Sequence, residues 1–195
     1  MLESLDLEEI TLVVVDWGGL IGLSYATQHP ERIRNIINTN TWLWQVDNDL
    51  NYQGFSGFVG GPVGRWLIRE FNFFVRMVNK FVYGDKSKYT PAIQRHLSMH
   101  LQELAKRKGN WVFPKQIVAA SDWLAELWKN RSELDGKVKF FAWGRKDIAF
   151  REKELNYWTR HFPDVRVVRY QGVGHFLAEE VPQELIKKIS VILEK

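Results

Sequence analysis

Four short apolar runs, spaced along the chain, predict the strands of a parallel β-sheet. Thr11–Val15 is an unbroken β-branched run without alternation, as expected for a strand that is covered on both faces. Ile33–Thr39 is more polar, and Val138–Trp143 and Val165–Tyr170 each follow a turn that contains Gly or Pro. The four runs therefore predict a sheet whose strands are mostly buried.

Helical patterns alternate with these strands. Gly19–Gln28 is mostly apolar and ends before a proline, Glu152–His161 follows the third strand, and Pro182–Glu194 carries one apolar stripe. Strands and helices that alternate in this way form right-handed βαβ units. We therefore expect an α/β fold.

The stretch between the second and third strands is far longer than a simple crossover, which needs only about a dozen residues. Residues 42–133 contain helical patterns and no convincing strand; the patterns cover Val63–Val82, Thr90–Lys106 and Pro114–Lys129. We interpret residues 1–41 and 134–195 as the core and residues 42–133 as an inserted helical cap. Open α/β sheets place their sites at the carboxyl ends of the strands, where such a cap would lie.

Composition narrows the possible functions. The chain has 195 residues, of which 45% are hydrophobic and 26% charged, and its net charge of +4 is spread without a long basic run, so we expect neither nucleic acid nor a membrane as partner. The absence of cysteine excludes disulfides and thiolate metal sites and suits a reducing compartment. With no secretory leader recognisable, we expect a cytoplasmic protein. The 9 Trp and 12 Phe fit either an apolar pocket or a bulky core.

The first strand runs directly into Asp16, and Trp17, Gly18 and Gly19 follow. A strand, one displayed side chain and small residues that open a helix are typical of a nucleophile elbow, although the displayed residue is usually serine. The alternative is that Asp16 only caps the next helix, which is a frequent role for Asp after a strand.

Asp147 lies just after the third strand and His175 just after the fourth. The order nucleophile, acid, histidine is that of the α/β-hydrolases, and all three residues fall at the same rim of the predicted sheet. Although a single Asp or His in a loop is usually a solvated surface residue, three in this order favour a catalytic triad. His96 and His100, one helical turn apart in the insertion, have no third ligand at suggestive spacing and fit a helix face better than a metal site.

Together these motifs resemble the haloalkane dehalogenase family. The similar segments are Val15–Gly19, His29–Ile33, Trp143–Asp147, Gly174–Phe176 and, in the insertion, Gly60–Arg65. The resemblance covers nearly the whole chain. It implies a substrate that is a small apolar halogenated compound, a halide product, and neither cofactor nor metal.

The resemblance also implies roles for individual residues. Asp16 would attack the halogen-bearing carbon and form an alkyl ester, and His175 would activate the water that hydrolyses this ester. The acid follows either the second or the third strand in the family; Asn38 and Asn40 offer no carboxylate at the first position, so Asp147 takes the role. A carboxylate gains nucleophilicity in a dry pocket.

Trp17 matches the halide-binding tryptophan of the family, and an indole N–H is a suitable donor to a halide. The alternative for Trp17 is packing against the elbow. A second halide donor comes from the cap in some members, and Trp42, Trp44, Trp66 and Trp111 are all candidates.

The resemblance further predicts that an N-terminal portion of the family is absent from this chain, so that the nucleophile strand becomes a sheet edge. We therefore expect the chain to self-associate, to swap elements with a second copy, or to need a separate N-terminal piece, and activity of the chain alone is doubtful.

Two functions compete with dehalogenation. One is epoxide hydrolysis, with Tyr52, Tyr83 or Tyr89 as donor; the other is a non-catalytic remnant of a hydrolase.

Overall fold

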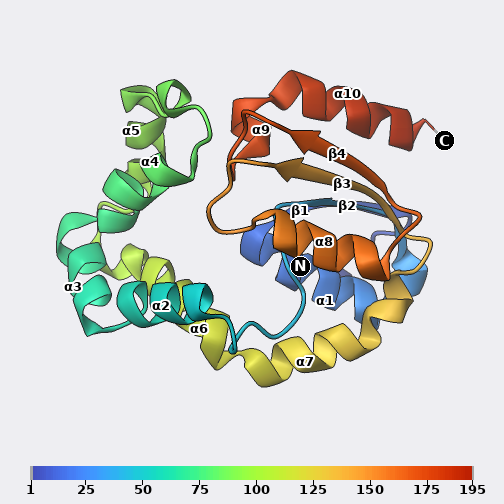
Figure 1. Ribbon diagram of the computed structural model, residues 1–195, viewed down its shortest axis with the longest axis horizontal. Helices are drawn as coiled ribbons and strands as arrows, with labels where there is room; N and C mark the ends of the chain where they lie inside the picture. Colours follow the sequence, from blue (N-terminus) through green and yellow to red (C-terminus); the bar gives the residue numbers. More distant parts are fainter. Residues whose placement is uncertain (1, 195) are drawn as a thin grey trace.

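The computed structural model describes residues 2–194 and contains one parallel four-stranded sheet. Its strands are β1 (Ile10–Val15), β2 (Ile33–Thr39), β3 (Val138–Gly144) and β4 (Arg166–Tyr170), and they lie side by side in sequence order (Figure 1). The predicted α/β fold with a parallel sheet is confirmed, and each strand lies within about one residue of its expected position.

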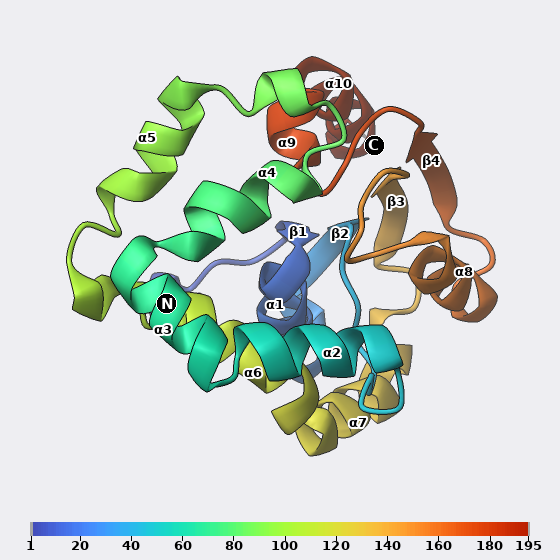
Figure 2. The same ribbon diagram turned by 60° about the vertical axis from the view of Figure 1, so that its left-hand side comes forward.

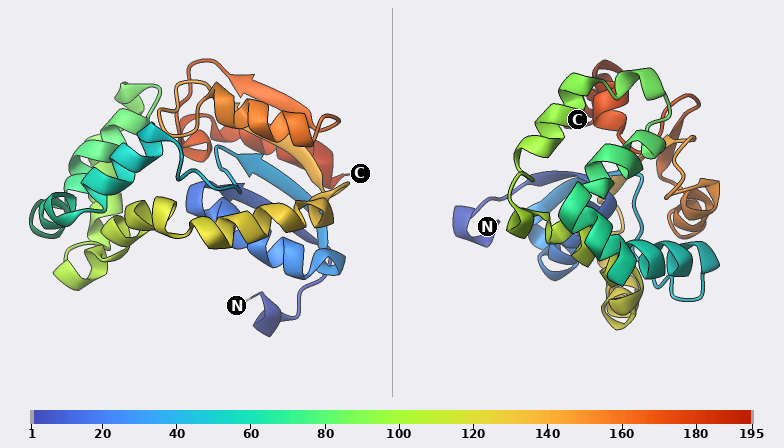
Figure 3. Two further views of the ribbon diagram at one scale, coloured as in Figure 1. Left: turned by 60° about the horizontal axis from the view of Figure 1, so that its bottom comes forward. Right: turned by 90° about the vertical axis from the view of Figure 1, so that its left-hand side faces the viewer.

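Helices cover both faces of the sheet. On one face lie α1 (Asp16–Gln28) and α8 (Glu152–His161), and on the other lie α9 (Leu177–Glu180) and α10 (Pro182–Leu193) (Figures 1 and 3). Successive residues of a strand point to opposite faces. Accordingly, Ile36 of β2 packs in the apolar cluster with Leu23 of α1 and Trp158 of α8, whereas the adjacent Ile37 packs with Leu185 of α10.

The insertion between β2 and β3 is helical. Its helices are α2 (Leu50–Val59), α3 (Pro62–Phe71), α4 (Asn79–Val82), α5 (Pro91–Met99), α6 (Gly109–Ala119) and α7 (Ser121–Lys129). The arrowheads of β3 and β4 point toward α2 to α6, and α7 returns along the sheet on the side of α1 (Figure 1). Figure 2 shows α2 to α5 following one another in an arc beyond the carboxyl ends of the strands.

The insertion is more broken than its sequence pattern predicts. The expected helix Val63–Val82 is interrupted at Asn72, whose φ of 50° ends α3, and a π-helical turn over Phe74–Val78 leads into α4. A left-handed residue ends a helix because the chain must change direction there, and Asn tolerates this conformation. The apolar pattern continued across Asn72, which is why the break was not predicted.

Two other expected helices also divide, and one helix was not predicted. Thr90–Lys106 becomes α5 and a 3-10 turn, Leu104–Arg107, and Pro114–Lys129 becomes α6 and α7. Helix α2 was missed because two glycines reduce its helical propensity. Its N-cap is Asp49, whose side chain accepts a hydrogen bond from the backbone N of Asn51 at 3.0 Å.

The outer side of β1 forms one edge of the sheet. Val13 and Val15 of this strand are 50% and 40% exposed, and Ile21 on the adjacent α1 is 58% exposed. In the right-hand view of Figure 3 the N-terminal segment extends away from the sheet next to β1. Nowhere in residues 2–194 does a helix have both the length and the apolar character that a membrane crossing requires.

Candidate active site

Asp16 occupies a strained turn between β1 and α1. Its φ is 47°, in the left-handed region that residues other than glycine rarely adopt. The turn is held from both sides, because the backbone N of Asp16 donates to Asn40 O at 3.1 Å and Thr41 Oγ1 donates to Asp16 O at 2.7 Å. The N-cap of α1 is Val15, with no side-chain cap bond, so the carboxylate of Asp16 does not cap the helix.

Gly19 allows α1 to lie close to the loop after β2. A Cβ atom at this position would lie 2.0 Å from Thr41 Oγ1, the atom that donates to the carbonyl of Asp16. At Gly18, by contrast, a Cβ would meet nothing within 4 Å. Close approach at Gly19 is therefore part of the geometry that displays Asp16, as expected for an elbow.

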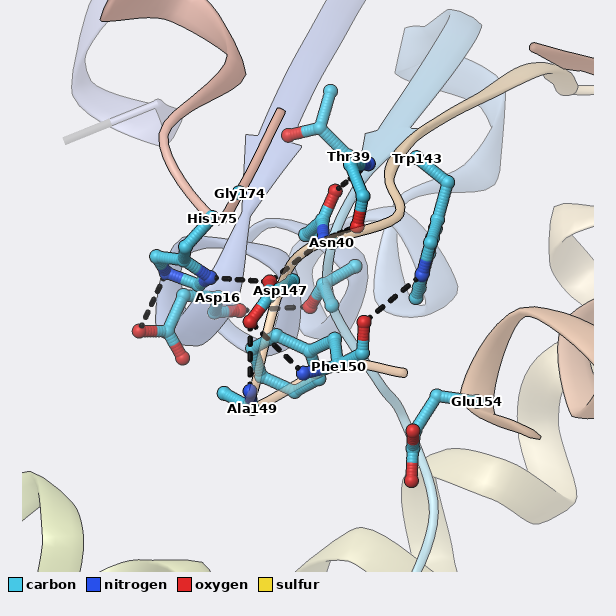
Figure 4. A network of polar contacts seen from close by, with 12 residues as sticks. Asp16, Thr39, Asn40, Trp143, Asp147, Ala149, Phe150, Glu154, Gly174 and His175 are labelled. Atoms are coloured by element: carbon cyan, nitrogen blue, oxygen red, sulfur yellow. Dashed lines mark hydrogen bonds and ion pairs between the residues drawn. The ribbon is translucent and has the colours of Figure 1, made fainter. Parts of the chain in front are cut away.

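The structure brings Asp16, His175 and Asp147 into one line of contacts (Figure 4). His175 Nδ1 lies 2.8 Å from Asp147 Oδ2, and His175 Nε2 lies 3.4 Å from Asp16 Oδ2. The side chain of Asp147 is fully buried, that of His175 nearly so, and that of Asp16 is 44% exposed. One imidazole thus joins an inner carboxylate to an outer, accessible one, which is the arrangement that a catalytic triad requires.

Asp147 is fixed by more than His175. Its Oδ1 accepts hydrogen bonds from the backbone N of Ala149 at 2.7 Å and of Phe150 at 3.2 Å. Its Oδ2 also accepts from Asn40 Nδ2 at 2.6 Å. Three donors besides the imidazole therefore hold this buried side chain in one orientation.

Asn40 contacts the candidate triad, and the sequence pattern did not predict this contact. Its Oδ1 accepts from the backbone N of Gly144 at 2.9 Å while its Nδ2 donates to Asp147, so Asn40 links the end of β2 to the loop after β3 (Figure 4). Asn40 is fully buried. A polar residue that directly follows a buried strand, at the same rim as Asp16 and Asp147, was the available signal.

The charge state of His175 follows from its neighbours. Burial alone lowers the pKa of an imidazole, but the carboxylates of Asp147 and Asp16 outweigh burial and raise the pKa of His175 to about 10. The ring is also confined, since Phe150 stacks on it with centroids 5.6 Å apart and Phe176 meets it edge-on at 4.9 Å. While both carboxylates are charged, His175 is therefore protonated at neutral pH.

A cavity of about 390 Å³ opens above Asp16 and His175, within the size range of sites for small molecules. Residues of the insertion form much of its wall; the apolar ones are Phe55, Phe74, Val78, Val82, Phe113, Pro114 and Ile117. Trp17 is half-buried in the same cavity, packed against Trp42 and Phe113. Within residues 2–194 the indole N–H of Trp17 has no hydrogen-bond acceptor, so a free donor belongs to a residue that lines the same cavity as Asp16.

The four other tryptophans proposed as halide donors lie in different places. Trp42 is fully buried and borders the cavity of Asp16, and its enclosed indole nitrogen has no hydrogen-bond partner among residues 2–194. Trp44 packs against the rings of Trp128, Tyr157 and Trp158. Trp66 and Trp111 line a separate cleft between α3 and α6.

The tyrosines that an epoxide hydrolase would need have their hydroxyl groups engaged elsewhere. Tyr52 borders the cavity, but its hydroxyl donates to Ala149 O at 3.0 Å. The hydroxyl of Tyr83 donates to Glu179, and that of Tyr89 donates to the backbone O of Val75. Epoxide opening needs a donor that points into the cavity, and none of these three hydroxyls is free to supply it.

His96 and His100 of the insertion were considered as a possible metal pair. The rings of His96, on α5, and His100, the residue after α5, lie edge to face with centroids 6.2 Å apart. Across the described part of the chain, no three His, Asp or Glu side chains are grouped closely enough to hold an ion. A structural zinc site takes four protein ligands and a catalytic one takes three.

Curated relatives of this chain include dehalogenases and a decarboxylase. The chain is 32% identical over 176 residues to haloalkane dehalogenase 2 of Mycobacterium tuberculosis, an alignment that covers 89% of this chain and 60% of the relative. It is 27% identical over 207 residues to a cis-3-alkyl-4-alkyloxetan-2-one decarboxylase of Shewanella oneidensis, covering 97% of this chain and 61% of that protein. The chain thus spans about 60% of the length of these relatives.

Solved structures agree with the fold. The haloalkane dehalogenase DatA of Agrobacterium tumefaciens C58 superposes with a TM-score of 0.84 at 18% identity, over 99% of this chain and 69% of that one. The model of the α/β-hydrolase fold family matches residues 1–182, which is nearly the whole chain. The chain therefore belongs to the α/β-hydrolase fold family.

Proposed function

We propose that this protein is a hydrolase that cleaves carbon–halogen bonds of small haloalkanes through an alkyl ester on Asp16. The observation that carries the proposal is the contact line Asp16–His175–Asp147 at an apolar cavity that Trp17 also lines. Similarity to haloalkane dehalogenase 2 of Mycobacterium tuberculosis supports the same substrate class.

In the first step a carboxylate oxygen of Asp16 attacks the carbon that bears the halogen. The new C–O bond forms as the carbon–halogen bond breaks, and the halide departs with the bonding electrons. The apolar wall excludes water that would otherwise solvate and weaken the carboxylate as a nucleophile. The indole N–H of Trp17 donates to the departing halide, where negative charge develops.

In the second step His175 acts as a base. Esterification removes the charge of Asp16, one of the two carboxylates that raise the pKa of His175, so the imidazole releases a proton more readily. The neutral Nε2 then accepts a proton from water, and the water oxygen attacks the carbonyl carbon of the ester. The bond between the carbonyl carbon and the alkoxy oxygen then breaks. The alcohol leaves with the second proton of the attacking water, the carboxylate of Asp16 is restored, and Asp147 stabilises the imidazolium that holds the first proton.

An assay of the chain with three substrates tests the proposal. We expect bromide and 1-butanol from 1-bromobutane, no diol from styrene oxide, and no carbon dioxide from a cis-3,4-dialkyl oxetan-2-one. Diol formation without bromide would favour an epoxide hydrolase, and carbon dioxide without bromide would favour a decarboxylase like the Shewanella oneidensis relative. Failure to turn over any of the three would favour the non-catalytic remnant.

Trp17→Phe should slow bromide release by about 10- to 100-fold, because the ring is kept while one hydrogen bond to a charged group is lost. Pre-steady-state bromide release measures the effect on the first step directly. Trp44→Phe is the matched control, since Trp44 packs among other aromatic rings outside this cavity. Equal effects of the two substitutions would argue that Trp17 only packs against the elbow.

We also propose that a second copy of the chain covers the outer edge of β1. An edge strand with exposed Val13 and Val15 presents both unpaired backbone groups and apolar side chains, and such edges pair with another strand. We expect the wild-type chain to sediment as a dimer and Val13→Lys to shift it to monomer. Val191→Lys, at an exposed position on α10, is the control. A wild-type chain that remains monomeric at high concentration would refute this proposal.

A further inference from the structure

The backbone of the insertion meets the backbone of the His175 loop directly at two glycines. Gly84 follows α4, and a Cβ there would lie 2.4 Å from both Gly172 O and Gly174 N. A Cβ at Gly174 would lie 2.1 Å from Val82 O. Because no side chain separates the two segments, any group that binds both backbones controls where His175 sits relative to the insertion.

Glu180 is such a group. Its carboxylate is buried, with the residue 3% exposed, and it accepts hydrogen bonds from three backbone N–H groups. Gly84 and Asp85, each at 3.0 Å, belong to the insertion, and Gly174, at 2.8 Å, immediately precedes His175. One carboxylate therefore joins the insertion to the histidine loop.

No ion pair with Glu180 is found among residues 2–194 in addition to these hydrogen bonds. Within residues 2–194 no Lys or Arg side chain forms an ion pair with it, although Lys88 donates to the backbone O of Glu180. A buried charge without a counter-ion depends on its hydrogen bonds for stabilisation. The three N–H groups thus hold Glu180, and Glu180 holds the two segments that carry them.

The same segments contact each other on the other side of His175. The backbone N of His175 donates to Val82 O at 2.8 Å, and the ring of Tyr83 packs on Phe176 with centroids 5.2 Å apart. Val82 and Phe176 both border the cavity. The imidazole and part of the cavity wall consequently share one junction.

We propose that Glu180 is a positioning residue that holds His175 within reach of Asp147 and Asp16 by fixing its loop to the insertion. The catalytic consequence rests on the proposed function, whereas the effect on the imidazole does not. If the hydrogen bonds of Glu180 are weakened, the loop that carries His175 shifts. The imidazole then separates from the carboxylates of Asp16 and Asp147, which are the cause of its raised pKa.

Glu180→Gln tests the inference, with Glu184→Gln on the exposed side of α10 as the matched control. The amide can accept from some of the three N–H groups but faces at least one of them with its own N–H. In an NMR titration we expect the pKa of His175 to move by about one pH unit or more toward its ordinary value in Glu180→Gln and to stay in place in Glu184→Gln. This measurement needs no substrate.

Kinetics then separates positioning from a loss of folded protein. We expect the first equivalent of bromide to be released within about twofold of the wild-type rate, while hydrolysis of the ester slows by at least about tenfold, since only the second step uses His175. A substitution that merely reduced the folded fraction would lower the amount of bromide released in the burst and the rate of turnover by the same factor. If the chain releases no bromide at all, the proposed function fails, and the titration still decides the role of Glu180.

An unchanged pKa of His175 in folded Glu180→Gln would overturn the inference. Should that variant not fold, Glu180→Asp keeps the charge but shortens the side chain, and the same titration applies. The wild-type chain offers an independent check by hydrogen exchange. The amides of Gly84, Asp85 and Gly174 should exchange slowly and with a common protection factor, and fast, unequal exchange of the three would also overturn it.

Discussion

Asp16→Asn should abolish bromide release, including the first equivalent, and lower turnover by at least about 1,000-fold. The carboxamide is neutral and a far weaker nucleophile than a carboxylate, so the first step itself is blocked. Asparagine is among the few residues that tolerate the left-handed conformation of position 16, where φ is 47°, so the elbow should persist. Quenched-flow measurement of bromide together with thermal unfolding checks both statements.

The control for this substitution is Asp164→Asn, an exposed position in the turn before β4. It removes the same charge far from the cavity and should leave bromide release unchanged. The pKa of His175 should also fall in Asp16→Asn, because one of the two carboxylates that raise it becomes neutral. Continued bromide release from a folded, undeamidated Asp16→Asn protein would mean that another group attacks the substrate.

His175→Phe should stop turnover but preserve the first step. Phenylalanine is close to histidine in size and would lie between Phe150 and Phe176, which already flank the ring. Without a base near the ester, hydrolysis should slow by at least about 1,000-fold, while bromide release continues up to one equivalent of active sites. Burst kinetics under excess 1-bromobutane measures both rates.

His161→Phe is the matched control, because His161 lies at the end of α8 against Trp128 and Tyr157, away from the cavity. It should turn over as the wild-type chain does. If His175→Phe also turns over repeatedly, the water is activated by another group and the assignment of the base is wrong.

The sheet could be predicted from the sequence because its strands are mostly apolar runs, and turn residues limit two of the runs. The burial expected for the first strand was not found, because Val13 and Val15 are exposed at the edge of the sheet. The insertion could be predicted only in outline. Its helices are half-exposed and lack the unbroken periodicity of core elements, so neither the break at Asn72 nor α2 was visible in the pattern. Local conformation and tertiary packing decide such boundaries.

Some residues of the candidate site could also be predicted from the sequence, and others could not. Asp16, Asp147 and His175 each follow a strand directly, so the topology of a parallel sheet already places them at one rim. Asn40 and Glu180 were not predicted, because Asn40 binds a side chain 107 residues away and two of the three amides that Glu180 binds are 95 and 96 residues away. Contacts of this kind leave no periodic signal in the sequence.

Each part of the fold contributes one component of the candidate site. The elbow displays a carboxylate that is accessible to the cavity, the loop after β3 provides a buried carboxylate, and the loop after β4 places an imidazole between them. The insertion supplies an apolar wall and, at Gly84, a fixed contact with the imidazole loop. A nucleophilic carboxylate at an apolar cavity, followed by a base that becomes active after esterification, is the chemistry that this arrangement supports best.

The most direct test is intact-mass spectrometry of His175→Phe after incubation with 1-bromobutane, followed by peptide mapping. A butyl group carried by Asp16, in an amount equal to the bromide released, is the result that we predict. Bromide release without any butylated protein, or a butyl group on a different side chain, would contradict an ester on Asp16 as the intermediate.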